Sequence, residues 1–407
     1  MKNWEKKKLS EICHFVRGPF GGSLKKSIFT ESGYAVYEQQ HAIYDQFDVI
    51  RYFIDENKFN EMKRFELNSG DLIMSCSGTM GKISIVPDGI PKGIINQALL
   101  KLTPSNKVST VFLKLWMQSE SFQDSLKELS GGAAIQNVPS VAIMKNIEIP
   151  LPTLTEQQLI VTILDETFIA IDKAKANAQQ NLKNAKELFD SYLQSVFENK
   201  GEDWKEKKLN EITEVKDGTH DSPKYINEGI PFVTQKNIKS NGLIFEDTKF
   251  ITDVDHEKFY KRSNVAYGDI LISMIGANRG MAALVDDNRI FSIKNVGLIK
   301  ASENINKHFL LYYLKSPLAM KYVLYMSNGG AQEFVGLTAL RSFPIPFPSL
   351  KAQQTIVQKL DALNAETKKL EAIYQQKINN LDELKKSVLQ KAFTGELKTN
   401  KILEYEL

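Results

Sequence analysis

The sequence IPLPTLTEQQLIVTILDETF, residues 149–168, begins the segment that decides the fold of this 407-residue chain. Pro150 and Pro152 end whatever precedes it, because proline has no amide hydrogen to donate inside a strand or helix. Thr153 or Thr155 can then cap a helix. No glycine or proline follows until after Phe197. The segment therefore predicts one long helix.

Apolar residues in this segment recur at alternating spacings of four and three, and Lys175 alone interrupts the series: Leu164, Phe168, Ile171, Lys175, Ala178, Leu182, Ala185, Phe189, Tyr192, Val196. A period near 3.5 over several heptads indicates a helix that packs lengthwise on another helix. The partner lies in the same chain.

Residues 345–361, IPFPSLKAQQTIVQKLD, repeat the same device 196 positions later. The second seam is Leu360, Leu363, Thr367, Leu370, Tyr374, Lys377, Leu381, Leu384, Val388. Polar residues also match at this distance: Gln157 and Gln158 with Gln353 and Gln354, Asp165 with Asp361, Gln194 with Gln390. Amphipathic helices alone do not require identical polar residues, so this is an internal repeat.

The segments before the two helices also repeat. Trp4-Glu-Lys-Lys-Lys-Leu9 matches Trp204-Lys-Glu-Lys-Lys-Leu209, and further matches follow downstream: Gly70-Asp71 with Gly268-Asp269, Gly78 with Gly276, Asn96 with Asn295, Phe112 with Phe309, Gly131-Gly132 with Gly329-Gly330. The side chains between these blocks differ. Each segment mixes short strand-like runs and turns with at least one helix, which predicts an α+β module.

We therefore divide the chain into module one (residues 1–150), a first long helix (151–200), module two (201–347), a second long helix (348–398) and a C-terminal tail (399–407). The expected fold is two repeated α+β modules separated by two long helices that form an antiparallel coiled coil with pseudo-twofold symmetry. About 40 helical residues span roughly 60 Å, so the helices would act as a spacer with the modules at opposite ends. A pairing centred on the helices places Ala176 beside Tyr374.

Composition restricts the class of protein. With 42% hydrophobic and 25% charged residues, the chain is typical of globular proteins. It has no apolar run of membrane-spanning length and no signal peptide in MKNWEKKKLSEI. Cys13 and Cys76 are the only cysteines, and their spacing is not that of a redox or metal pair. We expect a cytoplasmic protein.

Motifs of the common catalytic sites are missing. The sequence has no phosphate loop, no dinucleotide-binding glycine motif and no Gly-x-Ser-x-Gly elbow. It also has no Asn-Pro-Pro-aromatic tetrapeptide, which an amino-methyltransferase would be expected to carry, and its five histidines do not pair at metal-binding spacing. Asp71 and Asp269 follow glycines and are expected to form turns. We predict no catalytic residue, no metal site and no enzyme activity.

The loops instead offer groups that bind nucleic acid. Arg and Lys contact phosphate or guanine, and Gln and Asn contact adenine edges. The predicted DNA-binding residues are Arg17, Lys25, Lys26, Gln39, Gln40, His41 and Lys82 in module one, with His220, Lys224, Gln235, Lys236, Asn237, Arg279 and Lys294 in module two. Any one of them could be ordinary surface, but two parallel sets on a repeated scaffold favour DNA.

The chain resembles the specificity subunit of type I restriction-modification systems, which carries two target recognition domains. The likeness covers essentially the whole chain and is strongest at residues 149–165 and 345–361. The turns Gly18-Pro-Phe-Gly-Gly-Ser-Leu-Lys-Lys26 and Asp217-Gly-Thr-His220 also look like segments of that family's target recognition domains.

This resemblance implies a non-catalytic subunit that reads a bipartite site in double-stranded DNA, one half per module. It would dock two methyltransferase (modification) subunits and work with restriction (motor-nuclease) subunits. No cofactor is expected in this chain, and S-adenosylmethionine, ATP and magnesium would be bound by those partners.

Three alternatives stay open from the sequence. The chain could be the specificity module of a single-chain, type IIG-like restriction enzyme-methyltransferase. It could be a two-domain enzyme with a helical dimerisation arm, or a scaffold that binds only protein. Neither the DNA target nor the gap between its halves can be read from the sequence.

Overall fold

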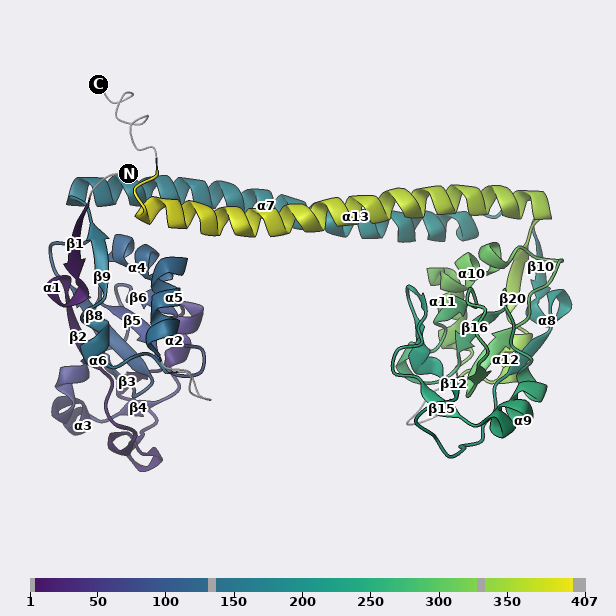
Figure 1. Ribbon diagram of the computed structural model, residues 1–407, viewed down its shortest axis with the longest axis horizontal. Coiled ribbons are helices and arrows are strands. Elements are labelled where there is room, and N and C mark those ends of the chain that lie inside the picture. The colour runs from purple at the N-terminus through teal and green to yellow at the C-terminus, as the bar shows by residue number, and fades with distance from the viewer. Residues whose placement is uncertain (1–3, 131–136, 328–333, 398–407) are drawn as a thin grey trace, which may run out of the picture. The chain divides into compact units, whose positions relative to one another are not determined.

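The computed structural model describes residues 4–130, 137–327 and 334–397 (Figure 1). The tail at 399–407 and the glycine pairs Gly131-Gly132 and Gly329-Gly330 lie outside these residues. The chain forms two compact units, Met1–Ala178 with Gln376–Leu407, and Gln179–Gln375. Each unit holds one module and parts of both long helices.

Module one contains two small sheets. The first has the order β2-β8-β5-β6 and is antiparallel throughout: Cys13–Arg17, Leu99–Pro104, Leu72–Ser75 and Ile83–Ile85. The second has the order β4-β3-β7, Phe53–Ile54, Tyr34–Tyr37 and Gly93–Ile95, with β3 and β7 parallel. The β5 residues are all buried, so both faces of this strand are covered.

Helices surround these sheets (Figure 1). They are α1 Leu9–Ile12, α2 Gln39–Tyr44, α3 Glu56–Glu61, α4 Thr110–Gln118, α5 Glu120–Leu129 and α6 Val141–Met144, with short 3-10 turns at Gly21–Ser23, Lys26–Ile28 and Lys63–Phe65. Ser109 caps α4 by accepting the amide hydrogen of Phe112. Helices α4 and α5 are separate, because Ser119 has an extended backbone between them.

Module two repeats this plan. Its sheets are β11-β19-β16-β17 (Val215–Asp217, Val296–Ile299, Ile270–Ser273, Ala282–Leu284) and β15-β12-β18 (Lys249–Ile251, Ile230–Val233, Ser292–Ile293). Again one pair, β12 and β18, is parallel. A further hairpin, β13-β14 (Ile238–Lys239, Gly242–Leu243), is paired only in this module among the described residues.

The helices of module two follow in the same order: α8 Leu209–Ile212, α9 Asp253–Ser263, α10 Lys307–Lys315, α11 Pro317–Tyr325 and α12 Leu337–Arg341, with 3-10 turns at Gln235–Asn237 and Gly276–Asn278. The α10-α11 pair is broken at Ser316 as the α4-α5 pair is broken at Ser119. Two modules with the same sheet orders and helix pairs confirm the predicted repeat.

A two-stranded ribbon joins the start and the end of each module. In module one β1, Glu5–Lys8, pairs antiparallel with β9, Glu148–Leu151. In module two β10, Lys205–Lys208, pairs with β20, Pro344–Phe347. Pro150 lies inside β9 opposite Lys6, so the prediction that it ends the preceding structure is wrong. A ribbon strand has one unpaired edge, and proline is accepted where its missing hydrogen is not needed.

The long helices are α7, Leu154–Glu198, and α13, Leu350–Phe393. The Thr153 hydroxyl accepts the amide hydrogen of Glu156, as predicted. In unit one, α7 and α13 run antiparallel, because Asp172 pairs with Lys385 at 2.8 Å and Lys175 pairs with Asp382 at 2.5 Å. The lysine that interrupts the first seam therefore has a carboxylate partner on the other helix.

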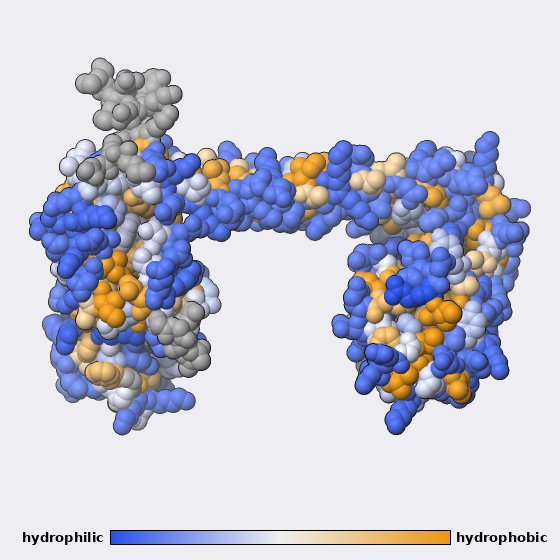
Figure 2. All heavy atoms as spheres, viewed as in Figure 1, coloured by the Kyte–Doolittle hydropathy of each residue, from blue (hydrophilic) through white to orange (hydrophobic). Residues whose placement is uncertain are grey.

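These ion pairs correct the expected register. Three residues forward on α7 correspond to three residues back on α13. Ala176, which was expected beside Tyr374, is therefore level with Leu381, and Ala178 is level with Asn379. Ala178 is buried, as is Ile378 beside that level, whereas Ala176 is exposed. The predicted seam members Tyr192, Lys377 and Leu384 are also exposed. Leu193 and Ile378, which follow the first two, are buried. Most of the helix surface in Figure 2 is hydrophilic, as expected outside a narrow seam.

Each module is also fixed to the helix that follows it by a buried glutamine. The Gln157 side chain accepts the Ser109 amide hydrogen at 2.8 Å and donates to the carbonyl oxygens of Pro152 and Lys107 at 2.9 and 3.3 Å. Gln353 accepts the Asn306 amide hydrogen at 2.8 Å and donates to the Pro348 carbonyl at 2.9 Å. Both side chains are fully buried.

The phenylalanines that matched in sequence make equivalent contacts. In unit one, Phe112 of α4 packs edge-on against Phe393 of α13, with ring centroids 5.2 Å apart. In unit two, Phe309 of α10 packs against Phe197 of α7 at 5.5 Å. Each module core therefore includes the first turns of one long helix and the last turns of the other.

Replacing Gln157 by Leu should lower the free energy of unfolding of unit one by about 2–4 kcal/mol, because the Ser109 amide and two carbonyls lose their buried partner. Gln158→Leu is the matched control, since Gln158 is exposed. Hydrogen exchange of the α4 amides, with α10 amides as an internal reference, measures the difference. Equal protection in the two variants would contradict this role for Gln157.

Candidate nucleic-acid interface

A shared frame positions the predicted residues in each module. Strand β3 leads into α2 in module one, and β12 leads into the 3-10 turn Gln235–Asn237 in module two. The backbone N–H of Glu38 donates to His41 Nδ1 at 2.9 Å, and the N–H of Thr234 donates to Asn237 Oδ1 at 2.9 Å. These are equivalent caps of equivalent turns.

Two predicted DNA-binding residues are therefore structural. His41 is 1% exposed, and its second nitrogen, Nε2, lies 3.1 Å from the Val49 carbonyl. Asn237 is 7% exposed and donates its amide hydrogens to the Ile244 carbonyl and the Thr248 hydroxyl. Their polar atoms are therefore used inside the module, and Asn237 also lines the pocket described below. The sequence placed both in loops, and nothing in it marked them as caps.

Asp71 and Asp269 form turns, as predicted. Asp71 accepts the Asn68 amide hydrogen, and Asp269 accepts that of Ala266. Both carboxylates are buried, and Lys300 donates to Asp269 at 2.5 Å. These aspartates hold the entrance to strands β5 and β16 and are not part of an exposed site.

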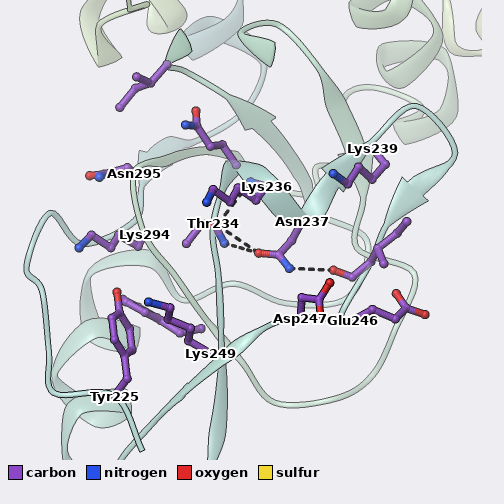
Figure 3. A pocket seen from close by; sticks show the side chains of 14 residues that line it. Tyr225, Thr234, Lys236, Asn237, Lys239, Glu246, Asp247, Lys249, Lys294 and Asn295 are labelled. Atoms are coloured by element: carbon purple, nitrogen blue, oxygen red, sulfur yellow. Dashed lines mark hydrogen bonds between the residues drawn. The ribbon is translucent and has the colours of Figure 1, made fainter. Parts of the chain in front are cut away.

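Module two has a pocket of about 780 Å³ above this frame (Figure 3). Four lysines and two carboxylates line it, together with aromatic and amide side chains: Tyr225, Phe232, Thr234, Gln235, Lys236, Asn237, Lys239, Ile244, Glu246, Asp247, Lys249, Ile275, Lys294, Asn295. The predicted residues Gln235, Lys236 and Lys294 thus come together at one concave surface. Its excess of positive charge suits a polyanion.

Residues that we did not predict complete this pocket. Lys249 lies over the Tyr225 ring, 4.3 Å from its centroid, and in Figure 3 both lie on the same side as Lys294. Lys239 and Glu246 lie on the other side of the pocket. Asn295 has a left-handed backbone, φ 52°, which is uncommon outside glycine and favours asparagine. Of these residues, only Asn295 could have been found from the sequence, through its match with Asn96.

A charged network holds the edge of the pocket. Arg262 donates twice to Asp217 Oδ1, at 3.0 and 2.7 Å, and His220 Nε2 lies 3.1 Å from Asp217 Oδ2. The other His220 nitrogen, Nδ1, lies 2.7 Å from Asn295 Oδ1. His220 is therefore exposed but tethered at both nitrogens. Lys294 is held in a similar way, since it donates to the Ser222 hydroxyl at 2.6 Å.

Module one places Arg17 and Gln39 on the corresponding frame. Arg17 ends β2, directly before Gly18, whose amide donates to the Leu99 carbonyl, as Gly218 donates to Val296. Within the part of the chain that the structure describes, Arg17 Nη1 and Gln39 Oε1 are buried without a hydrogen-bond partner. Buried polar atoms without partners are rare, and they call for an explanation such as a ligand.

Arg17 also lies close to a cysteine. Burial raises the pKa of the Cys76 thiol to about 12, and the nearby Arg17 guanidinium opposes this shift in part. The thiol therefore stays protonated at neutral pH and does not provide an anion for Arg17.

The other predicted residues lie mainly at the surface. Lys25, Lys26, Lys82 and Lys224 are exposed, and Gln40 is half-buried in the first turn of α2. Arg279 is half-buried and donates to the Ser327 hydroxyl and the Gly276 carbonyl. Among the described residues, no group of three or more His, Cys, Asp or Glu side chains is placed to hold a metal ion. None of the described helices has the length and apolar character to span a membrane.

Comparison with protein families now identifies the chain's relatives. The family model of the type I restriction modification DNA specificity domain matches residues 1–184 and again residues 201–380. The chain belongs to this family. The two matches correspond to the two repeats, so the repeated unit of the fold is the unit of the family.

Individual proteins of this family are similar to the chain over most of its length. The chain is 25% identical over 362 residues to the type I restriction enzyme MjaVIII specificity subunit of Methanocaldococcus jannaschii, covering 84% of this chain and 82% of that protein. Among solved structures, a chain of a type I R-M system described for its complex assembly and conformational transition superposes with a TM-score of 0.74 at 18% identity, covering 97% and 98% of the two chains. The HsdS subunit from Thermoanaerobacter tengcongensis gives 0.62 at 20% identity, covering 97% of each. These two structures share the fold.

Replacing Asp217 by Asn should lower the free energy of unfolding of unit two by about 1–2 kcal/mol, because Arg262 loses its carboxylate and His220 loses one tether. The control is Asp221→Asn. Hydrogen bonding and charge from Lys258 lower the pKa of the Asp221 carboxyl, but this pair is fully exposed and should not measurably affect stability. Hydrogen exchange in β11 and β19 reads the difference. A larger loss from the Asp221 change would contradict the network.

Proposed function

We propose that this chain is the DNA sequence-specificity subunit of a type I restriction-modification complex. Each module reads one half of a bipartite target in double-stranded DNA. The single observation that carries this proposal is the repeat. The family's DNA specificity domain occurs twice, on one scaffold, with different side chains at the same positions of its frame.

The contacts follow from the arrangement of each module. In module two, Lys236, Lys239, Lys249 and Lys294 would neutralise phosphates around the pocket, while Gln235 and Asn295 face the base edges. In module one, Arg17 Nη1 and Gln39 Oε1 are buried and have no hydrogen-bond partner among the residues that the structure describes. Arg17 would read guanine and Gln39 would read adenine, since each side chain matches the edge of that base in the major groove.

Catalysis would belong to other subunits. The chain would dock two methyltransferase subunits, which bind S-adenosylmethionine, and would act with restriction subunits that use ATP and magnesium. The names of the relatives support such an assembly, because they describe specificity subunits of restriction enzymes. In this arrangement the present chain contributes sequence recognition and no chemistry.

Exchanging residues 213–344 for those of a relative with a different target should change one half of the methylated motif and leave the other half unchanged. The reason is that each module carries its own set of reading residues. Single-molecule long-read sequencing of methylated adenines, in cells that supply the methyltransferase subunit, measures both halves at once.

The reciprocal exchange of residues 13–148 is the control and should change the other half alone. A motif altered in both halves by either exchange, or in neither half by both, would contradict one module per half-site.

A further inference from the structure

Phe20 is the most exposed large hydrophobic side chain among the residues that the structure describes, with 92% of its surface accessible. It lies in the turn between β2 and the residues that lead to β3, three positions after Arg17. A single exposed apolar residue needs no explanation by itself. The way this turn is built, and the charged residues near it in the sequence, do call for an explanation.

The turn is anchored on both sides of Phe20. A side chain at Gly18 would place its Cβ 1.8 Å from the Asn96 carbonyl oxygen, so the backbone is pressed against the strand end and only glycine fits. Pro19 and Leu24 are buried. The Ser23 amide donates to the Phe20 carbonyl at 2.8 Å. With buried residues before and after it, Phe20 is held outward by a fixed backbone.

The sequence on either side of Phe20 is cationic. The segment Arg17–Lys26 contains Arg17, Lys25 and Lys26 and no acidic residue. Both lysines are exposed, and Arg17 keeps a buried nitrogen without a partner in the described chain. An apolar ring among cations suits DNA, in which bases stacked in the interior are flanked by phosphates.

Module two has a different ring at the same position. His220 follows Gly218 by two residues, as Phe20 follows Gly18, and both glycines press against the equivalent strand end. His220, however, is bound at both nitrogens to Asp217 and Asn295. Module one therefore presents a free apolar ring where module two presents a tethered polar ring.

We propose that Phe20 is a wedge that enters the DNA of the module-one half-site and unstacks one base step, whereas His220 leaves the module-two half-site stacked. Apolar side chains that insert between base steps bend or open the duplex and gain contact area in return. Lys25 and Lys26 hold the flanking phosphates while Arg17 and Gln39 read the adjacent bases. The two half-sites are thus deformed to different extents. This inference rests on the proposed function.

The test uses the full chain assembled with its methyltransferase subunit and a duplex carrying the target motif. 2-Aminopurine, whose fluorescence rises when it leaves the base stack, replaces one base at a time in either half-site, never the methylated adenine. The variants are Phe20→Ala, Phe20→Leu and His220→Ala. Melting temperatures of the variants verify that they fold.

The native assembly should show a fluorescence rise at one step of the module-one half-site and none in the other half-site. Phe20→Ala should abolish most of this rise and weaken binding by about tenfold, the scale of one lost base-stacking contact. Phe20→Leu should keep much of the rise, because leucine is still an apolar wedge. His220→Ala should leave the rise unchanged.

Other results separate the explanations. Specific binding without any rise, or a rise that survives in Phe20→Ala, overturns the wedge and leaves the proposed function intact. Loss of the methyltransferase subunit from the Phe20→Ala assembly would make this side chain a protein contact and also overturn the wedge. Absence of sequence-specific binding by the native assembly would refute the proposed function itself.

Discussion

One buried side-chain amide in each unit fixes the module to the helix that follows it. Gln157 satisfies the first amide of the Ser109 turn and the carbonyls of Lys107 and Pro152, so α7 leaves module one in a single orientation. Gln353 does the same for α13 at Asn306. A polar group buried this completely must be hydrogen-bonded. Because hydrogen bonds are directional, they restrict the orientation of the helix more than apolar packing alone would.

The sheets and turns of the two modules are the same, and the modules differ in the side chains that these sheets and turns carry. Aspartates at the entrances to β5 and β16, caps at His41 and Asn237, and glycines at 18 and 218 build the same frame twice. On this frame, module two carries a lysine-lined pocket. Module one carries an exposed ring and, within the described residues, buried polar atoms that have no partner. Such a division allows recognition to change without altering the core.

The sequence was sufficient to predict the repeat, the long helices and the α+β modules, because each depends on local spacing and on matched residues. It identified Gln157 and Gln353 as matched residues of the repeat but not as buried anchors. The backbone amides that they bind, those of Ser109 and Asn306, lie far away in the sequence. The sequence did not identify His41 and Asn237 as caps, because a cap and a base contact use the same side-chain atoms.

The helix register was misplaced for a related reason. Seam periodicity gives the inward face of each helix but not the level at which two helices meet. That level is marked here by Asp172 with Lys385 and Lys175 with Asp382, pairs more than 200 residues apart. The pocket could not be predicted from the sequence either, because only the tertiary fold brings Lys294 to Ser222 and Lys249 to Tyr225.

The central claim is that one chain reads two separate half-sites. Selection of duplexes from a random library by the chain with its methyltransferase subunit, followed by sequencing, tests it most directly. The account predicts two short conserved blocks separated by an unspecified gap of constant length, with affinity that falls steeply as salt rises. A single contiguous block, or no enrichment at all, would contradict it.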